Sequence, residues 1–347
     1  MKHSHLVGIS AIIIHLITIM IVPAQCADIR SDIHDLREKE VTLDSYTFPG
    51  FYYDIDNDIG TEMLTFKLSD MNQDRSSAVL SDQVDAGGNR GAEYITESIP
   101  VDFSFSSWGQ YEDLGFLGGE YFAAYDGNVT SSMALSNQSV PFLYDNSMDR
   151  NLMTSEQISE IMIDDDTEQT FDSSTPLELE EGYKLAIKSV DENGNKVYLE
   201  LSKNGRVVDS KVVSPSIENA DMVDQTYYYK KDLGGSKDIV IIAVHFKNAF
   251  SSAGDQIATI DGKFQISDKP MTIRVDQRYG KMTVRLVDPA TETIILDNKD
   301  NLITLSKNKD IELMGSFHIR TADQDDTSVD NPLRYYLYCN ESCDCGS

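Results

Sequence analysis

Apolar and polar residues alternate along most of this chain, which is the pattern of strands with one buried face. Beyond residue 41, turn residues interrupt the alternation at short intervals, and helical spacing is scarce. One helical turn is expected near residues 155–162. Many short strands with frequent turns indicate an all-β protein. Strands are predicted over Met63–Ser69, Val101–Phe105, Lys184–Val190, Lys196–Ser202, Val207–Val213, Ile239–Phe246, Met282–Val287 and Leu302–Ser306.

The turn-forming residues indicate how the predicted strands are grouped into subdomains. Asn-Gly pairs within residues 191–196 and 203–206 supply the positive backbone angles of tight hairpin turns, which predicts a three-stranded meander. The meander lies in a compact, self-contained segment, 176–268, whereas the flanking segments look incomplete alone. We therefore expect two β-sandwich subdomains. The first combines 42–175 with 269–338, and the second, 176–268, is inserted in it.

The first 27 residues have the pattern of a secretory signal peptide, because Lys2 precedes an apolar run over residues 6–22 and a small-residue exit. Lipid attachment at Cys26 and a retained signal anchor are alternatives, since the run is nearly long enough to span a bilayer. Residues 28–41 are expected to be a linker. Its apolar residues have the spacing of a short helix face: Ile29, Ile33 and Leu36.

The charge balance limits which classes of partner the protein can bind. The 347 residues include 58 acidic and 29 basic side chains, for a formal net charge of −29. This argues against a nucleic-acid partner, since phosphate binding needs clustered Lys and Arg. An acidic surface keeps a secreted protein soluble and attracts cations. Adaptation to a salty medium explains the same composition.

Cysteines and glycosylation sequons are few. Cys26 lies at the signal exit, and residues 27–338 contain no cysteine, so the fold is expected not to depend on disulfides. A local disulfide, a covalent link to a neighbour and a metal site remain open for the tail, residues 339–347. The tail cysteines are Cys339, Cys343 and Cys345. Candidate glycan sites are Asn128, Asn137 and Asn340.

Calcium is the one cofactor that the sequence suggests. Alternating carboxylates within residues 54–62 form either a solvated acidic turn or a loose calcium site. An EF-hand is excluded, because Ile59 and Thr65 occupy the positions that require glycine and glutamate. A second acidic run, residues 164–166, is a weaker candidate. The candidate calcium ligands are Asp54, Asp56, Asp58 and Glu62.

Catalytic patterns are missing, so no enzyme is expected. The predicted mature chain has three histidines, and none stands in a nucleophile elbow, a zinc-protease motif or a Cys–His arrangement. His245 lies in an apolar strand, where a structural role is expected. The glycine-rich segment within residues 70–100 lacks the Lys-Ser/Thr of a phosphate loop and is expected to be an exposed excursion.

One segment is specific enough to suggest a family. Residues 47–66 combine an aromatic cluster, three alternating aspartates and an alternating strand: TFPGFYYDIDNDIGTEMLTF. This segment resembles the opening signature of the S-layer family duplication domain of methanosarcinal archaea. Later segments resemble the same domain in the family's order, over about residues 42–338: SEIMIDDDTEQT, LELEEGYKLAIKSVDENGNKVYLELSKNGRVVDSKVVSP, IIAVHFKNAF and RYGKMTVRLV.

The resemblance implies two β-sandwich subdomains and a structural role at the cell surface, with other S-layer subunits as partners, either itself or a two-domain relative. Acidic pore walls are expected to admit cations and repel anions. The family's main lattice proteins are expected to carry two domain copies, a spacer and a membrane helix, whereas this sequence has one copy followed by the cysteine tail. A lattice subunit, a decorating subunit and a released protein therefore remain open. Membrane contact is expected only through a retained signal helix. The alternative is a secreted or surface module that binds calcium, a glycan or another cell surface.

Overall fold

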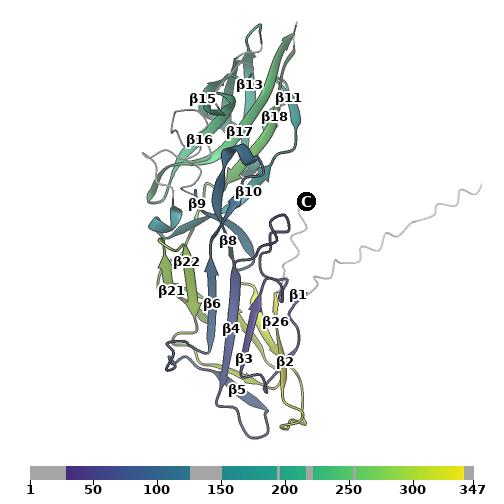
Figure 1. The fold of residues 1–347 in the computed structure, drawn as a ribbon, viewed down its shortest axis with the longest axis vertical. Coiled ribbons are helices and arrows are strands. Elements are labelled where there is room, and N and C mark those ends of the chain that lie inside the picture. Colours follow the sequence, from purple (N-terminus) through teal and green to yellow (C-terminus); the bar gives the residue numbers. More distant parts are fainter. Residues whose placement is uncertain (1–28, 126–150, 194–195, 216–221, 253–254, 340–347) are drawn as a thin grey trace, which may run out of the picture.

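The alternating segments form antiparallel strands in a computed structural model, which describes residues 29–125, 151–193, 196–215, 222–252 and 255–339. The strands build two β-sandwiches that follow one another along the long axis of the molecule (Figure 1). We call them the terminal sandwich, with strands from both ends of the chain, and the middle sandwich, with strands between residues 99 and 272. The all-β fold class expected from the alternation is confirmed.

The terminal sandwich consists of an eight-stranded and a five-stranded sheet. The larger sheet has the order β20-β21-β22-β6-β4-β5-β23, with β3 paired to β4: Arg278–Tyr279, Met282–Asp288, Thr293–Asp297, Ala92–Glu97, Glu62–Ser69, Ser77–Leu80, Ile303–Ser306 and Glu40–Asp44. The smaller sheet has the order β1-β26-β25-β24, with β2 paired to β26: Ile29–Arg30, Arg334–Cys339, Phe317–Thr321, Asp310–Met314 and His34–Asp35.

The middle sandwich consists of a nine-stranded and a four-stranded sheet. The larger sheet has the order β16-β17-β18-β10-β9-β8-β7, with β11 paired to β18 and β19 to β10: Thr226–Leu233, Ser236–Ser252, Asp255–Ile266, Gln157–Asp165, Gly119–Tyr125, Gln110–Phe116, Ile99–Asp102, Gln169–Asp172 and Met271–Thr272. The smaller sheet has the order β12-β13-β14-β15: Leu177–Glu178, Tyr183–Val190, Val197–Lys203 and Arg206–Val213.

Helical structure among the described residues is limited to single turns. They are η1, η2, η3 and α2: Ser106–Trp108, Leu152–Ser155, Glu180–Gly182 and Met222–Gln225. None of the helices in the described part of the chain is long and apolar enough to span a membrane. The predicted signal peptide, residues 1–27, lies outside the described residues.

The expected meander over residues 183–213 is formed by β13, β14 and β15, which pair in sequence order. Its strands pack against the larger sheet of the middle sandwich through a shared core, to which Leu185, Leu199, Ile241 and Val244 all belong. Local turn chemistry was enough to predict this element, because each hairpin is closed by residues next to it in the sequence.

The expected short helix within residues 28–41 is wrong, and the segment is not a free linker. Instead, β1 and β2 pair with β26 at the other end of the chain, and β3 begins at Glu40. Leu36 is fully buried in the terminal core. Three apolar residues are too few to stabilise an isolated helix, whereas pairing with a distant strand satisfies the same backbone groups.

The helical turn expected near residues 155–162 lies slightly earlier in the chain. The 3₁₀ turn η2 overlaps the expected segment only at Ser155, and β10 then begins at Gln157. β10 pairs with both β9 and β18, so it holds two parts of the larger sheet together. Tertiary pairing therefore overrides the short helical spacing of its apolar residues.

The two hydrophobic cores do not follow the expected boundary at residue 175. Val101, Phe103 and Trp108 belong to the middle core, together with residues up to Ile266. Residues 41–94 share the terminal core with residues 273–339. Strands of the expected first segment do pair with strands of 269–338, because β6 pairs with β22 and β5 with β23. The first change of core along the chain thus falls near residue 98, well before 175. Five buried residues among those described between 98 and 175 still pack in the terminal core: Leu114, Phe116, Ala123, Met153 and Ile158.

Candidate functional site at the junction of the sandwiches

The signature segment, residues 47–66, forms a loop followed by β4 at the junction of the two sandwiches. Its aromatic residues anchor the loop. The Phe48 and Phe51 rings meet edge to face, 5.0 Å apart, and both contact Phe317 of β25 at 5.6 and 5.3 Å. Such edge-to-face contacts add to the free energy gained by burying each ring. The two phenylalanines therefore serve the terminal core, whereas Tyr52 and Tyr53 are half-buried and line the groove described below.

A close backbone contact joins the signature loop to the turn between β8 and β9. Gly118 has a φ of 86°, and a Cβ atom there would lie 2.5 Å from the carbonyl oxygen of Gly50. No L-residue fits this position without moving one of the two segments. The glycines therefore allow the middle sandwich to approach the signature loop.

Glu62 lies at the centre of this junction. Its carboxylate accepts hydrogen bonds from Tyr52 N at 2.6 Å, the Tyr94 hydroxyl at 2.7 Å and Gly118 N at 3.0 Å. Burial raises the pKa of Glu62 to about 7, although these hydrogen bonds lower it. Its role is to connect the loop, β6 and the β8–β9 turn. It does not face the loop aspartates as the predicted calcium site requires.

The loop aspartates are used by the loop itself. Asp54 Oδ1 accepts hydrogen bonds from Asp56 N at 2.8 Å and Asn57 N at 3.1 Å, and Asp58 accepts one from the Tyr53 hydroxyl. Within the described ranges, no three His, Cys, Asp or Glu side chains are placed to hold a metal ion. Turn geometry directs these carboxylates to nearby backbone groups, so three of them do not converge, and the calcium site stays a prediction.

An acidic groove of about 530 Å³ lies between the signature loop and the middle sandwich. Residues 52–57 form one wall, and residues 102–104 and 161–164 form the other. Its lining includes five carboxylates: Asp54, Asp56, Asp102, Glu120 and Asp164. The sequence did not suggest this grouping, since its members come from four separate segments.

Several carboxyl groups at this junction hold their protons more tightly than usual. Burial raises the pKa of Asp113 to about 8, with the nearby Glu120 adding to the effect. Burial also raises the pKa of Asp164 to about 6, although Ser104 N, 3.0 Å away, donates to its carboxylate. A desolvated carboxylate is costly, so these side chains bind protons near neutral pH.

The other residues singled out in the sequence are not brought together. Cys339 lies buried at the end of β26, with its Sγ 3.1 Å from Ser316 Oγ. His245 is structural in its contacts, since it stacks on Phe105 at 4.4 Å and its Nδ1 lies 2.5 Å from Asp261. Six further predicted residues lie outside the described residues: Cys26, Asn128, Asn137, Asn340, Cys343 and Cys345.

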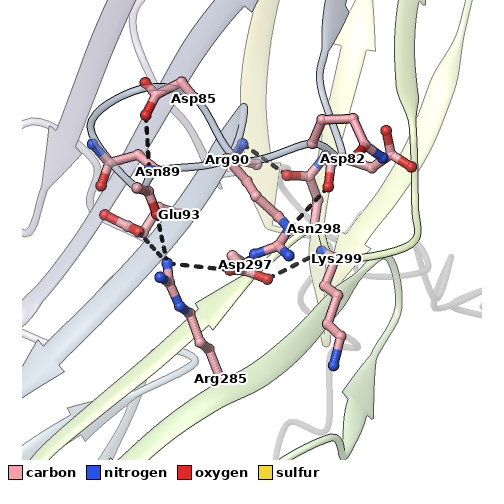
Figure 2. A network of polar contacts seen from close by, with 12 residues as sticks. Asp82, Asp85, Asn89, Arg90, Glu93, Arg285, Asp297, Asn298 and Lys299 are labelled. Atoms are coloured by element: carbon pink, nitrogen blue, oxygen red, sulfur yellow. Dashed lines mark hydrogen bonds and ion pairs between the residues drawn. The ribbon is translucent and has the colours of Figure 1, made fainter.

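The glycine-rich segment within residues 70–100 is held by a buried ion pair (Figure 2). Arg90 donates to the buried Asp297 at 2.6 Å and to the carbonyl oxygen of Asp82 at 2.9 Å. Arg285 lies 3.5 Å from the same aspartate and donates to the Gly88 carbonyl oxygen at 3.1 Å. These contacts hold the glycine-rich loop against β21 and β22. Sequence reasoning missed this network, because Arg90 and Asp297 are 207 positions apart.

Comparison with known proteins identifies the family of this chain. The model of the S-layer protein family matches residues 32–323. This chain belongs to the S-layer protein family. The match includes the middle sandwich, the terminal sandwich except β1 and β26, and the signature loop and junction described above.

Named members of the S-layer protein family are similar over most of this chain. The major S-layer protein of Methanosarcina acetivorans is 29% identical over 305 residues, which are 86% of this chain and 38% of that protein. The Methanosarcina mazei protein is 27% identical over 320 residues, 89% of this chain and 40% of that protein. The Methanosarcina barkeri protein is 29% identical over 303 residues, 86% of this chain and 38% of that protein. The chain therefore spans about two fifths of the length of these relatives.

Proposed function

We propose that this chain is a secreted structural subunit of a cell-surface S-layer and packs laterally into, or onto, a protein lattice. The observation that carries the proposal is the family match over residues 32–323, together with relatives that bear the name of major S-layer proteins. The elongated pair of sandwiches suits the role, because stacked sheets present long lateral faces for contact (Figure 1).

The proposed partners are other S-layer subunits, either copies of this chain or a longer relative. The names of the relatives describe a structural component, and we propose that this chain likewise acts without catalysis. Its net charge of −29 supports an acidic lattice that admits cations and repels polyanions. The division into two subdomains, with the change near residue 98, belongs to the same proposal.

The test is the amount of this chain in envelope sheets isolated from intact cells. Quantitative mass spectrometry counts it against the longer surface protein of the same sheets. We expect a constant ratio, near unity for a lattice subunit and lower for a decorating subunit. A chain found only in the medium contradicts the proposal and favours a released binding module.

A further inference from the structure

Among the described strands, none pairs with the outer edge of β15, at the margin of the middle sandwich. β16 of the facing sheet lies beside it, and there Tyr227 donates to Asp209 at 2.7 Å and Lys211 donates to the carbonyl oxygen of Thr226 at 3.4 Å. β15 ends the four-stranded sheet, and among the described strands only β14 pairs with it. An edge strand presents N–H and C=O groups that can pair with a strand of another chain. Val207, Val208 and Val212 are 60%, 42% and 51% exposed along this strand. Exposed apolar side chains on an open edge mark a surface suited to a protein partner.

The register with β14 separates the two faces of β15. Asp209 and Lys211 lie opposite fully buried leucines of β14, so both belong to the inner face. Ser210 and Val212 alternate with them and belong to the outer face. The opposite charges of Asp209 and Lys211 therefore lie two residues apart on the inner face of β15. Ser210 lies between them in the sequence and on the outer face.

This charge pattern selects one self-pairing register. When two copies of an antiparallel strand pair about a two-fold axis, hydrogen-bond alternation places a residue opposite its own copy. Asp209 on the axis brings two carboxylates together, and Lys211 on the axis brings two ammonium groups together; like charges directly opposite are destabilising. Ser210 on the axis places Asp209 opposite the second copy's Lys211, twice. It also places Val212 opposite Val208, which is the extra residue of a β-bulge in the pairing of β15 with β14. This register is charge-complementary.

Lys211 has contacts that suit such a partner. Its Nζ lies 3.1 Å from the centre of the Tyr228 ring and donates to the carbonyl oxygen of Thr226 at 3.4 Å. Burial lowers the pKa of Lys211 to about 8. Within the described residues it makes no ion pair, although the charges of Asp209 and Asp224 already raise its pKa against the effect of burial. A carboxylate from a second copy would stabilise its charge further.

We propose that β15 is the strand through which two copies of this chain pair, antiparallel over residues 208–212, with Ser210 on the two-fold axis. The four-stranded sheets of the two copies then form one continuous sheet. The inference deepens the proposed function, on which it rests, by naming one lateral contact surface between subunits.

Disulfide trapping of the full-length chain tests the register. With Ser210 on the axis, the two Cα atoms lie about 5 Å apart, within disulfide range. Ser210→Cys should therefore form a disulfide that joins the β15 peptides of two chains, identified by mass spectrometry. Val212→Cys, on the same strand and face, is the matched control, because its two copies lie about 14 Å apart in this register. Equal trapping of both variants, or none of either, overturns the proposal.

Sedimentation equilibrium over a concentration series gives a second, independent measurement. Val212→Lys should weaken dimerisation about tenfold or more, because each dimer carries the change twice. Val275→Lys, at a similarly exposed valine of the terminal sandwich, should leave dimerisation unchanged. Unchanged thermal unfolding shows that both variants fold. An unaffected dimer in Val212→Lys contradicts the proposed edge.

The two proposals fail in different ways. A chain that is present in envelope sheets but shows no Ser210→Cys trapping there overturns the role of β15 and leaves the lattice role intact. A chain that pairs through β15 in solution but is absent from the sheets supports the edge contact and overturns the lattice role.

Discussion

At the scale of single residues, this acidic protein uses many of its carboxylates as acceptors for its own backbone. Glu62 accepts from two backbone N–H groups of separate segments, and Asp54 closes the turn that follows it. Asp85 does the same in the glycine-rich loop, where it accepts from Gly87 N at 2.8 Å and Asn89 N at 2.9 Å. An acidic side chain in a turn is therefore no indication of a cation site by itself.

Glu62→Gln tests the anchoring role of this carboxylate. A glutamine amide offers one acceptor oxygen instead of two, so at least one buried donor among Tyr52 N, Gly118 N and the Tyr94 hydroxyl loses its partner. We expect a loss of about 1–3 kcal/mol in the free energy of unfolding at pH 8. Urea denaturation measures it. Glu97→Gln, on the exposed face of β6, is the control and should change little. Equal stability of the two variants would contradict the assigned role.

At the scale of elements, the hairpin of β8 and β9 connects the two sandwiches. Tyr111 and Phe122 pack in the middle core, whereas Leu114 and Phe116 pack in the terminal core. Its turn contacts the signature loop through Gly118, where the backbones touch. The hairpin thus contributes side chains to both cores, and the Gly118 position in its turn leaves no room for a Cβ atom.

Comparing Gly118→Ala with Gly88→Ala separates the cost of steric crowding from the cost of backbone strain. Gly118 and Gly88 have φ values of 86° and 88°, but only Gly118 has a backbone atom within 3 Å of a new Cβ; Gly88 faces open space. Gly88→Ala should cost about 1–2 kcal/mol, from backbone strain alone. Gly118→Ala should cost roughly 3 kcal/mol, because overpacking adds to the strain. Thermal unfolding monitored by circular dichroism compares them. Similar losses in both variants would show that the junction yields readily.

At the scale of the whole molecule, buried carboxyl groups make stability depend on pH. The pKa values of Glu62, Asp113 and Asp164 are raised to about 7, 8 and 6 in the folded protein. The folded state therefore binds more protons than the unfolded chain between about pH 4 and pH 8. Their contribution to stability is present at acidic pH and is lost as the pH rises through these values.

We expect the midpoint of thermal unfolding to fall as the pH is raised from about 5.5 to about 9, a window that spans these pKa values. Asp113→Asn mimics the protonated carboxyl and should flatten the decline. Asp268 has the opposite effect on the pH profile, because hydrogen bonds from Lys203 and Lys231 lower its pKa although the side chain is partly buried. The contribution of Asp268 to folding stability is therefore lost only in strong acid. Calorimetry across this range measures the profile. A midpoint that rises towards pH 9 would contradict the prediction.

The sequence by itself determined the local features of this protein. Alternation predicts the all-β class, and the Asn-Gly turns predict the meander of β13, β14 and β15, because a hairpin is specified by residues that adjoin one another. The order of characteristic segments, from the signature at residue 47 onward, was enough to suggest the S-layer family.

Only the tertiary structure decided which distant segments meet. β1 and β2 became strands rather than a linker because β26, at the far end of the described chain, offered them a free edge. Glu62 became an anchor rather than a ligand because Tyr94 and Gly118 converge on it. The acidic groove and the outer edge of β15 likewise depend on packing. A sequence pattern records the preference of each segment, whereas long-range pairing and burial decide which partners satisfy its polar groups.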